Sequence, residues 1–245
     1  ALYLMDHITN RAVSAEFGQY YVRFPIPAAP HIVQGNALEC DWNEVLPYVE
    51  ADFVFGNPPF AGHVTRSKAQ SDEMRNVWGS GYAKWLDYVT CWYRLAIDYD
   101  RDKRIKFAFV STNSISQGEQ VARLWQTLLD RGYRLDFAHR TFGWSSEASG
   151  RANVHVVIEG FSRGEGGNRL FTYSDLKSRP TEVKVSSISP YLIEGPANVV
   201  VHGRDDSPLS PAVPPIRYGS LPADGGHLIV SSAELADVDP VAKKY

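Results

Sequence analysis

The chain has 245 residues, 44% of them hydrophobic, and a formal net charge of -3 at pH 7. This length is enough for one sizeable core, or for one domain and part of another. The slightly acidic total does not predict a polyanionic partner, so binding to DNA would need local basic patches.

Neither a membrane span nor an export signal is visible in the sequence. No apolar run approaches the length of a transmembrane helix, and the first residues lack a signal-peptide pattern. Cys40 and Cys91 lie far apart, without CxxC or histidine-rich spacing. We therefore expect a cytoplasmic protein without membrane association, structural zinc or another bound metal.

Short apolar runs alternate with helical patterns along most of the chain. Residues 1–5 read as the middle of an amphipathic helix, and residues 6–21 as polar, irregular chain. Runs rich in Val, Ile and aromatic residues predict strands at 31–38, 52–56, 105–112, 134–139 and 154–161, with an edge strand at 168–173. Helical spacing covers 84–99 and 117–130, with Asp41 as the N-cap of a further helix and Gly132 as a C-terminal cap. Residues 61–80 and 141–152 are expected to be loops.

This order of elements predicts an α/β fold with a doubly wound sheet. Asn36, Asn57 and Asn113 lie at the exits of three of the expected strands, and such exits build sites at one edge of a sheet. After Lys177 the composition turns rich in Pro, Ser and Gly. We therefore divide the chain at about residue 176, with a catalytic domain at 1–176 and a linker or the start of a second domain at 177–245.

The apolar run at 53–55 stops at Asn57-Pro58-Pro59-Phe60, which is the candidate active site. No ladder continues through two prolines, so the chain must leave the sheet here. The prolines keep the turn stiff, and their carbonyl groups can be aimed outward. The Asn57 side-chain oxygen and the Pro58 carbonyl can then accept both hydrogens of a planar amine, while Phe60 offers a ring for stacking.

Asn-Pro-Pro-Phe after a hydrophobic strand resembles the catalytic motif of amino-group methyltransferases that use S-adenosylmethionine. Further blocks of this sequence, in order, resemble the methyltransferase domain of the MmeI-type enzymes, which are bacterial adenine methyltransferases often fused to a restriction nuclease. These blocks are GNAL at 35–38, FGNPPF at 55–60, LDYV at 86–89, FVSTNSISQGEQ at 109–120, AHRTFGWSSEA at 138–148 and VHVVIEGF at 154–161. The resemblance runs from about residue 1 to residue 162.

What the resemblance implies can be carried over residue by residue. The fold would be a Rossmann-like methyltransferase sheet, and the substrate would be double-stranded DNA with a flipped adenine. Asn57 and Pro58 would accept the hydrogens of the adenine amine at the corner that Pro59 completes, and Phe60 would stack on the base. The methyl donor would be S-adenosylmethionine, and the parent enzyme would serve a restriction-modification system.

Four further residues gain expected roles from the same resemblance. Asn36, with Ala37 beside it, occupies the place of a contact to the adenine of the cofactor. Phe142, or Trp144 in the same block, would form a second wall for the target base, and we prefer Phe142. Asn113 lies where the neighbouring strand closes the pocket.

One departure separates the sequence from the family. The glycine-rich cofactor loop, Asp-Pro-x-x-Gly-x-Gly, and the acidic residue that holds the ribose do not occur in this sequence. We therefore expect an internal fragment, followed by the beginning of a target-recognition region and accompanied by the rest of the parent polypeptide. By itself it should show no methyltransferase activity, and its sheet should expose an apolar edge.

Three other interpretations stay open from the residues alone. The same motif serves enzymes that methylate a protein glutamine amide or an RNA base. The chain could also be a non-catalytic DNA-recognition fragment. Asp175 with Glu182 and Lys184 has the residue order of a nuclease metal site, but a Glu-x-Lys arises easily by chance.

Overall fold

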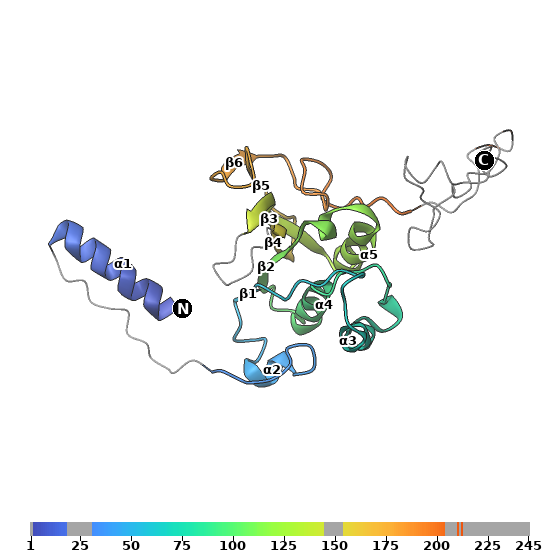
Figure 1. The fold of residues 1–245 in the computed structure, drawn as a ribbon, viewed down its shortest axis with the longest axis horizontal. Helices are drawn as coiled ribbons and strands as arrows, with labels where there is room; N and C mark the ends of the chain where they lie inside the picture. Colours follow the sequence, from blue (N-terminus) through green and yellow to red (C-terminus); the bar gives the residue numbers. More distant parts are fainter. Residues whose placement is uncertain (1, 19–30, 145–153, 204–209, 211, 213–245) are drawn as a thin grey trace, which may run out of the picture. The chain divides into compact units, whose positions relative to one another are not determined.

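The computed structural model describes residues 2–18, 31–144, 154–203, 210 and 212 (Figure 1). The chain divides into two compact units, residues 1–201 and 202–245, and every described helix and strand belongs to the first. The elements are α1 (Leu2–Phe17), α2 (Trp42–Val45), β1 (Phe53–Gly56), α3 (Lys68–Trp78), the 3-10 turn η1 (Gly79–Gly81), α4 (Thr90–Tyr99), β2 (Lys106–Thr112), the 3-10 turn η2 (Asn113–Ser116), α5 (Gly118–Leu129), β3 (Tyr133–Trp144), β4 (Val154–Arg163), β5 (Arg169–Thr172) and β6 (Thr181–Lys184).

Six strands form one mixed sheet in the order β1-β2-β4-β3-β5-β6. β1 is parallel to β2, and β3 is parallel to β5. β4 lies between β2 and β3 and runs antiparallel to both, so that β1, β2, β3 and β5 share one direction. The carboxyl ends of β1, β2 and β3 therefore meet at the same edge of the sheet, the edge at which open α/β sheets bind ligands.

Helices α4 and α5 lie beside the sheet (Figure 1), and an aromatic cluster joins them to it. The ring of Phe161, on β4, stacks on Tyr93 of α4, with 5.2 Å between ring centroids and 9° between ring planes. Phe107 of β2 stacks on the Phe161 ring at 5.3 Å, and Trp125 of α5 meets the Phe161 ring edge-on at 6.2 Å. Because these rings come from two helices and two strands, their packing fixes the helical layer on the sheet.

The expected exposed apolar edge is found at β1. This strand pairs only with β2 among the described strands, and Phe53 and Phe55 are 66% and 70% exposed. Both rings border a hollow of about 440 Å³ that is also lined by Phe107, Ala108 and Phe137. Apolar strand residues such as Phe53 and Phe55 normally pack against another structural element, so this surface is suited to such a contact.

The N-terminal helix is longer than the sequence pattern suggested. Residues 6–17 were expected to be irregular, but α1 continues to Phe17. It ends at Gly18, which has a φ of 64° and donates its N–H to the carbonyl of Ser14 at 2.9 Å. No Gly or Pro occurs between Leu2 and Phe17, so nothing in the sequence interrupts the helix before Gly18.

Two predictions in the region before α4 are wrong. Residues 31–38 form no strand: Ile32 is 81% exposed, and residues 36–40 make a turn in which the Asn36 carbonyl accepts two backbone N–H groups. Residues 61–80 are not a plain loop, because they contain α3. Ser67 caps this helix by accepting the N–H of Gln70 at 3.2 Å, and the Gln70 side chain accepts the Ser67 N–H at 2.9 Å.

Other element boundaries differ more modestly. Helix α4 begins at Thr90 rather than at 84, because the carbonyls of Lys84 and Leu86 accept hydrogen bonds from Arg66 instead of continuing a helix. The expected N-cap at Asp41 is confirmed, and Gly132 has the expected positive φ, 82°. β3 runs on to Trp144, and the remainder of the loop expected at 141–152 lies outside the described residues.

The sheet also continues farther along the chain than expected. β5 is not an edge strand, because β6 pairs with it from Thr181 to Lys184. The alternating sequence of β6 is short, and all four of its residues are exposed, so it carries little apolar signal. The division of the chain at about residue 176 stays a prediction.

A buried carboxyl group in the sheet predicts how stability depends on pH. Glu159 of β4 is fully buried, and neither carboxyl oxygen has a hydrogen-bond partner among the described residues. Burial raises the pKa of Glu159 from 4.5 to about 8. Between these values the folded protein keeps the proton that the unfolded chain loses, so the free energy of unfolding falls as the pH rises through this window.

We expect Glu159→Gln to remove this dependence. Near pH 4.5 the variant should closely match the original protein, and at pH 8.5 it should be more stable by up to about 5 kcal/mol, since each pKa unit corresponds to about 1.4 kcal/mol. Urea unfolding at both pH values measures the difference. Glu165→Gln, at an exposed position, is the matched control. Equal pH dependence in Glu159→Gln and the original protein would contradict the prediction.

Candidate active site

The four residues Asn57 to Phe60 leave the sheet directly after β1, which ends at Gly56. Asn57 is exposed, Pro58 is buried and Phe60 is half-buried. The next residue, Ala61, accepts the backbone N–H of Tyr88 at 2.9 Å. The corner is therefore anchored at both ends, with the amide group of Asn57 accessible to solvent.

Asp87 connects this corner with the end of β2. It is 4% exposed, and its Oδ2 accepts hydrogen bonds from the hydroxyls of Thr112, at 3.0 Å, and Ser114. Its backbone N–H donates to Gln120 Oε1 of α5 at 2.8 Å. A Cβ at Gly62 would lie 3.5 Å from its Oδ1, so the carboxylate lies close to the chain just after the corner.

The strand register places three of the expected site residues at one edge of the sheet. Asn57 follows Gly56, and Asn113 follows Thr112 on the parallel neighbouring strand. Thr112 pairs with Val156, which in turn pairs with Phe142. With neighbouring strands about 4.8 Å apart, Phe142 lies about 10 Å across the sheet from Thr112 and about 14 Å from the end of β1. The corner and Phe142 therefore lie at the same edge of the sheet, with β2 and β4 between them.

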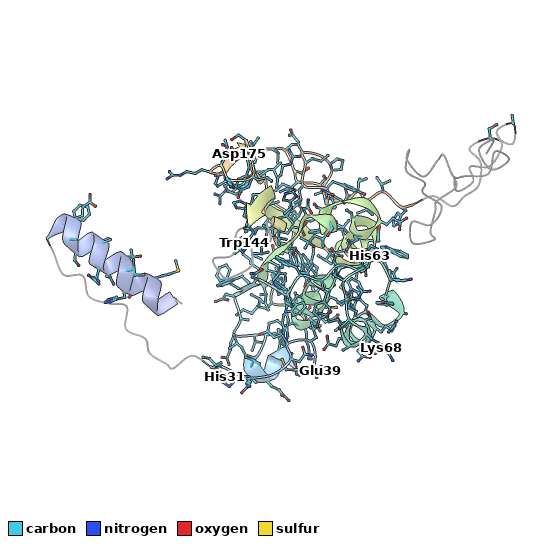
Figure 2. The ribbon with its side chains drawn as sticks, in the orientation of Figure 1. His31, Glu39, His63, Lys68, Trp144 and Asp175 are labelled. Atoms are coloured by element: carbon cyan, nitrogen blue, oxygen red, sulfur yellow. The ribbon has the colours of Figure 1, made fainter. Side chains whose placement is uncertain are left out.

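Phe142 belongs to an aromatic cluster at the end of β3. Its ring stacks on Tyr173 with 4.8 Å between centroids and 22° between planes, and it lies 6.3 Å from the rings of His139 and Trp144. Trp144, labelled in Figure 2, is 38% exposed. Both residues considered for the second wall are thus at this edge, and Phe142 has the more constrained ring.

His139 and Tyr173 form the polar contact of this cluster. His139 Nδ1 lies 2.8 Å from the Tyr173 hydroxyl, and its ring stacks on Phe171 at 4.2 Å. Burial, together with the charge of Arg169, lowers the pKa of His139. The neutral imidazole is therefore favoured, and its Nδ1 can accept a hydrogen bond from the Tyr173 hydroxyl.

The expected cofactor-contacting residues lie in an exposed turn before α2. Asn36 Oδ1 accepts the N–H of Leu38 at 3.1 Å, and the carbonyl of Ala37 accepts the indole N–H of Trp42 at 2.8 Å. Asn36 Nδ2 donates to Glu73 Oε1 of α3 at 2.8 Å. The other Glu73 oxygen accepts the hydroxyl of Tyr88, whose pKa is raised by burial and then by this carboxylate. Through Glu73 and Tyr88 the turn is connected to the chain beside Phe60.

The sequence did not reveal that Asp87, Glu73 and Arg66 hold the segments around the corner in place. Arg66 donates hydrogen bonds to the carbonyls of Leu86 and Lys84, at 2.5 and 3.0 Å, and also contacts side chains of Ser71, Met74 and Tyr82. It thereby holds the segment between the corner and α4. The Ser67-x-x-Gln70 capping pattern was the visible signal for α3, and Asp87 stands in the block LDYV.

The described geometry supports neither a nuclease metal site at Asp175 and Glu182 nor a reactive thiol at Cys91. Glu182 pairs across the sheet with Arg169, Oε1 to Nε at 2.9 Å, and this partner lowers the pKa of Glu182. Asp175 accepts the backbone N–H of Lys177 within a turn.

Burial raises the pKa of the Cys91 thiol to about 12, so this sulfur stays protonated. Among the described residues, no three His, Cys, Asp or Glu side chains gather as a metal-ligand group, and no helix is long and apolar enough to cross a membrane.

Comparison with known proteins gives three agreeing results. Residues 1–172 match the model of the family described as MmeI, DNA-methyltransferase domain. The chain is 34% identical over 241 residues to DNA methyltransferase A of Bacillus subtilis (strain 168), covering 97% of this chain and 27% of that protein. It is 41% identical to the type IIL restriction-modification enzyme MmeI, solved in complex with DNA, with a TM-score of 0.81, covering 96% of this chain and 32% of that one.

These similarities extend over nearly the whole chain, although it spans only about a third or less of either relative. The TM-score of 0.81 to the MmeI structure, over 96% of this chain, confirms the expected Rossmann-like α/β fold. With the family model matching residues 1–172, the chain belongs to the MmeI DNA-methyltransferase domain family.

Proposed function

We propose that the complete protein transfers a methyl group from S-adenosylmethionine to the N6 amine of an adenine flipped out of double-stranded DNA, in the cytoplasm, as part of a restriction-modification system. The observation that carries this proposal is the anchored corner at Asn57 to Phe60, with an accessible amide at the edge where β1, β2 and β3 end. Family membership supports DNA methylation, and the corner supports an amine as the acceptor.

The role of the corner is to bind and orient the amine. The nitrogen of adenine is a poor nucleophile because its lone pair is delocalised into the ring. If Asn57 Oδ1 and the Pro58 carbonyl accept its two hydrogens, the nitrogen can become tetrahedral and direct its lone pair at the donor. The Pro58 carbonyl is fixed before the reaction, because the Asn-Pro-Pro turn is stiff and Pro58 is buried, and the same turn fixes the backbone that carries Asn57.

The flipped base would lie between two aromatic surfaces. Phe60 is half-buried beside the corner, and Phe142 stands across the same edge of the sheet. Stacking on an aromatic ring contributes about 1–3 kcal/mol per base. Such stacking would offset part of the cost of removing the base from its duplex. Asn113, which follows β2, would close the pocket between them.

S-adenosylmethionine supplies the methyl group as a sulfonium donor. We assign Asn36 and Ala37 to the adenine of the cofactor on the resemblance, and both lie in a turn that Glu73 ties to the segment beside Phe60. The methionine end has no glycine-rich loop in this sequence to receive it.

Asn57→Ala in the complete protein should abolish methylation while DNA binding is kept. Losing one fixed acceptor of this kind lowers kcat by about 100-fold or more. Mass spectrometry of digested DNA measures N6-methyladenine, and a gel-shift titration measures DNA affinity. Asn76→Ala, at an exposed position on α3, is the matched control. Unchanged methylation by Asn57→Ala would defeat the assignment, and methyl groups found on RNA or on a protein glutamine instead would favour the other substrates.

Asp87→Ala should lower kcat about tenfold with little change in DNA affinity, because the hydroxyls of Thr112 and Ser114 lose the carboxylate that holds the end of β2 beside the corner. Single-turnover methylation measures the rate, and thermal unfolding checks that the fold is kept. Asp102→Ala, 94% exposed at its side chain, is the control. A rate equal to that of the control would show that Asp87 has no part in placing the corner.

Residues 1–245 alone should bind the cofactor weakly. With only the Asn36 turn available to it, S-adenosylhomocysteine should give a Kd above about 1 mM by titration calorimetry, corresponding to less than about 4 kcal/mol of binding free energy. Sub-micromolar binding would contradict this prediction. If that binding were lost in Asn36→Ala, the turn at Asn36 and its neighbours would be sufficient to bind the cofactor. If it survived in Asn36→Ala, the assignment of Asn36 would be wrong as well.

A further inference from the structure

We propose that Tyr173 is a positioning residue that fixes the ring plane of Phe142, and that it thereby links the chain after β5 to the wall of the base pocket. The inference rests on the proposed function, in which Phe142 contacts the flipped adenine. Nothing in the chain's resemblance to its relatives singled out Tyr173, which follows β5 directly and lies just past the residues that match the family model.

The first observation is the pair of contacts that hold the Tyr173 ring. One face of Phe142 stacks on it at 4.8 Å, and its hydroxyl meets His139 Nδ1 at 2.8 Å. His139 is itself fixed by stacking on Phe171, at 4.2 Å and 6° between the planes. The result is a connected group of four rings, in which Tyr173 is held by the hydrogen bond to His139 and supports Phe142 by stacking.

The second observation is a backbone contact beside the same ring. The N–H of Gly143 donates to the carbonyl of Leu176 at 2.8 Å. A Cβ on Gly143 would meet this carbonyl oxygen at 2.9 Å and the Leu176 side chain at 3.3 Å, closer than ordinary contacts allow. Glycine is therefore needed at this position for residues 173–176 to lie along the end of β3.

The strand register explains why these contacts matter. β5 pairs with β3 only as far as His139, where it faces Phe171. The pairing of β3 with β4 is irregular between His139 and Phe142, which indicates a bulge there. On the side away from β4, residues 173–176 therefore replace β5 as the neighbour of β3 where it carries Phe142. Trp144 and Asp175, labelled in Figure 2, belong to these two adjoining segments.

A functional consequence follows from the geometry of stacking. An adenine laid against Phe142 gains most when the two planes are parallel and offset, so a ring that can tilt loses part of this contact. Tyr173 supports the ring of Phe142 through its face. It also belongs to the connection between β5 and β6 of the same sheet, so movement of that connection would be transmitted to the pocket wall.

The test uses the complete protein and a DNA duplex with 2-aminopurine at the target adenine, whose fluorescence rises when the base leaves the stack. The variants are Phe142→Leu, Tyr173→Leu and the double variant, with Tyr173→Phe to keep the stack but remove the hydroxyl. Tyr191→Phe is the matched control, because it also removes one hydrogen-bonded hydroxyl, which at that position accepts the N–H of Val201. Methylation kinetics and thermal unfolding accompany each fluorescence measurement.

We expect Phe142→Leu and Tyr173→Leu each to lower the fluorescence rise and to reduce kcat/KM about tenfold, the size of effect expected for one lost base-stacking contact. The double variant should be no worse than Phe142→Leu, because Tyr173 acts through that ring. Tyr173→Phe should lose about twofold to fivefold, and the control should match the original protein.

The possible failures are distinguishable. If Phe142→Leu flips and methylates normally, or if the original protein does neither, the proposed base pocket is wrong and this inference falls with it. If Phe142→Leu is impaired while Tyr173→Leu and Tyr173→Phe behave like the control, only the inference is overturned. Losses that multiply in the double variant would also overturn it, since Tyr173 would then act independently of Phe142. Should Tyr173→Leu fail to fold, Tyr173→Phe decides by its kinetics relative to Tyr191→Phe.

Discussion

Two consecutive prolines determine where the candidate site can be. Neither Pro58 nor Pro59 can donate to a β-ladder, so β1 stops at Gly56 while its neighbour β2 continues to Thr112. The chain must leave the sheet at the edge where the parallel strands end. The site then follows from packing: Pro58 is buried, Asn57 remains exposed, and the carbonyl of Ala61 binds the N–H of Tyr88.

The remainder of the framework holds this corner without contributing acceptors to the amine. Asp87 joins it to β2 and α5, Arg66 holds the connection towards α4, and Glu73 joins it to the turn at Asn36. Asp87 is buried, and Arg66 and Glu73 are half-buried, and each of the three binds partners from separate segments of the chain. The aromatic cluster around Phe161 supplies the rigid support on which these segments rest.

Local sequence signals predicted the parts of the fold that depend on local physics. The strands at β1, β2 and β4 and helix α5 were visible as apolar runs and helical spacing, and Asp41 was visible as a cap. The order of the sheet was not visible, because the antiparallel insertion of β4 between β2 and β3 depends on long-range pairing. Residues 31–38 were wrongly predicted as a strand. They have the composition of a strand but pair with no strand among the described residues.

The candidate site was predictable at its centre and not around it. Asn57 to Phe60 carry their chemistry in four adjacent residues, whereas Asp87 and Tyr173 act through contacts with residues distant in the chain. A structure of the complete protein with its target DNA and a cofactor analogue would show whether the corner binds the amine. We expect the N6 amine of a flipped adenine about 3 Å from both Asn57 Oδ1 and the Pro58 carbonyl. An adenine that remains stacked in the duplex, or lies away from this corner, would contradict it.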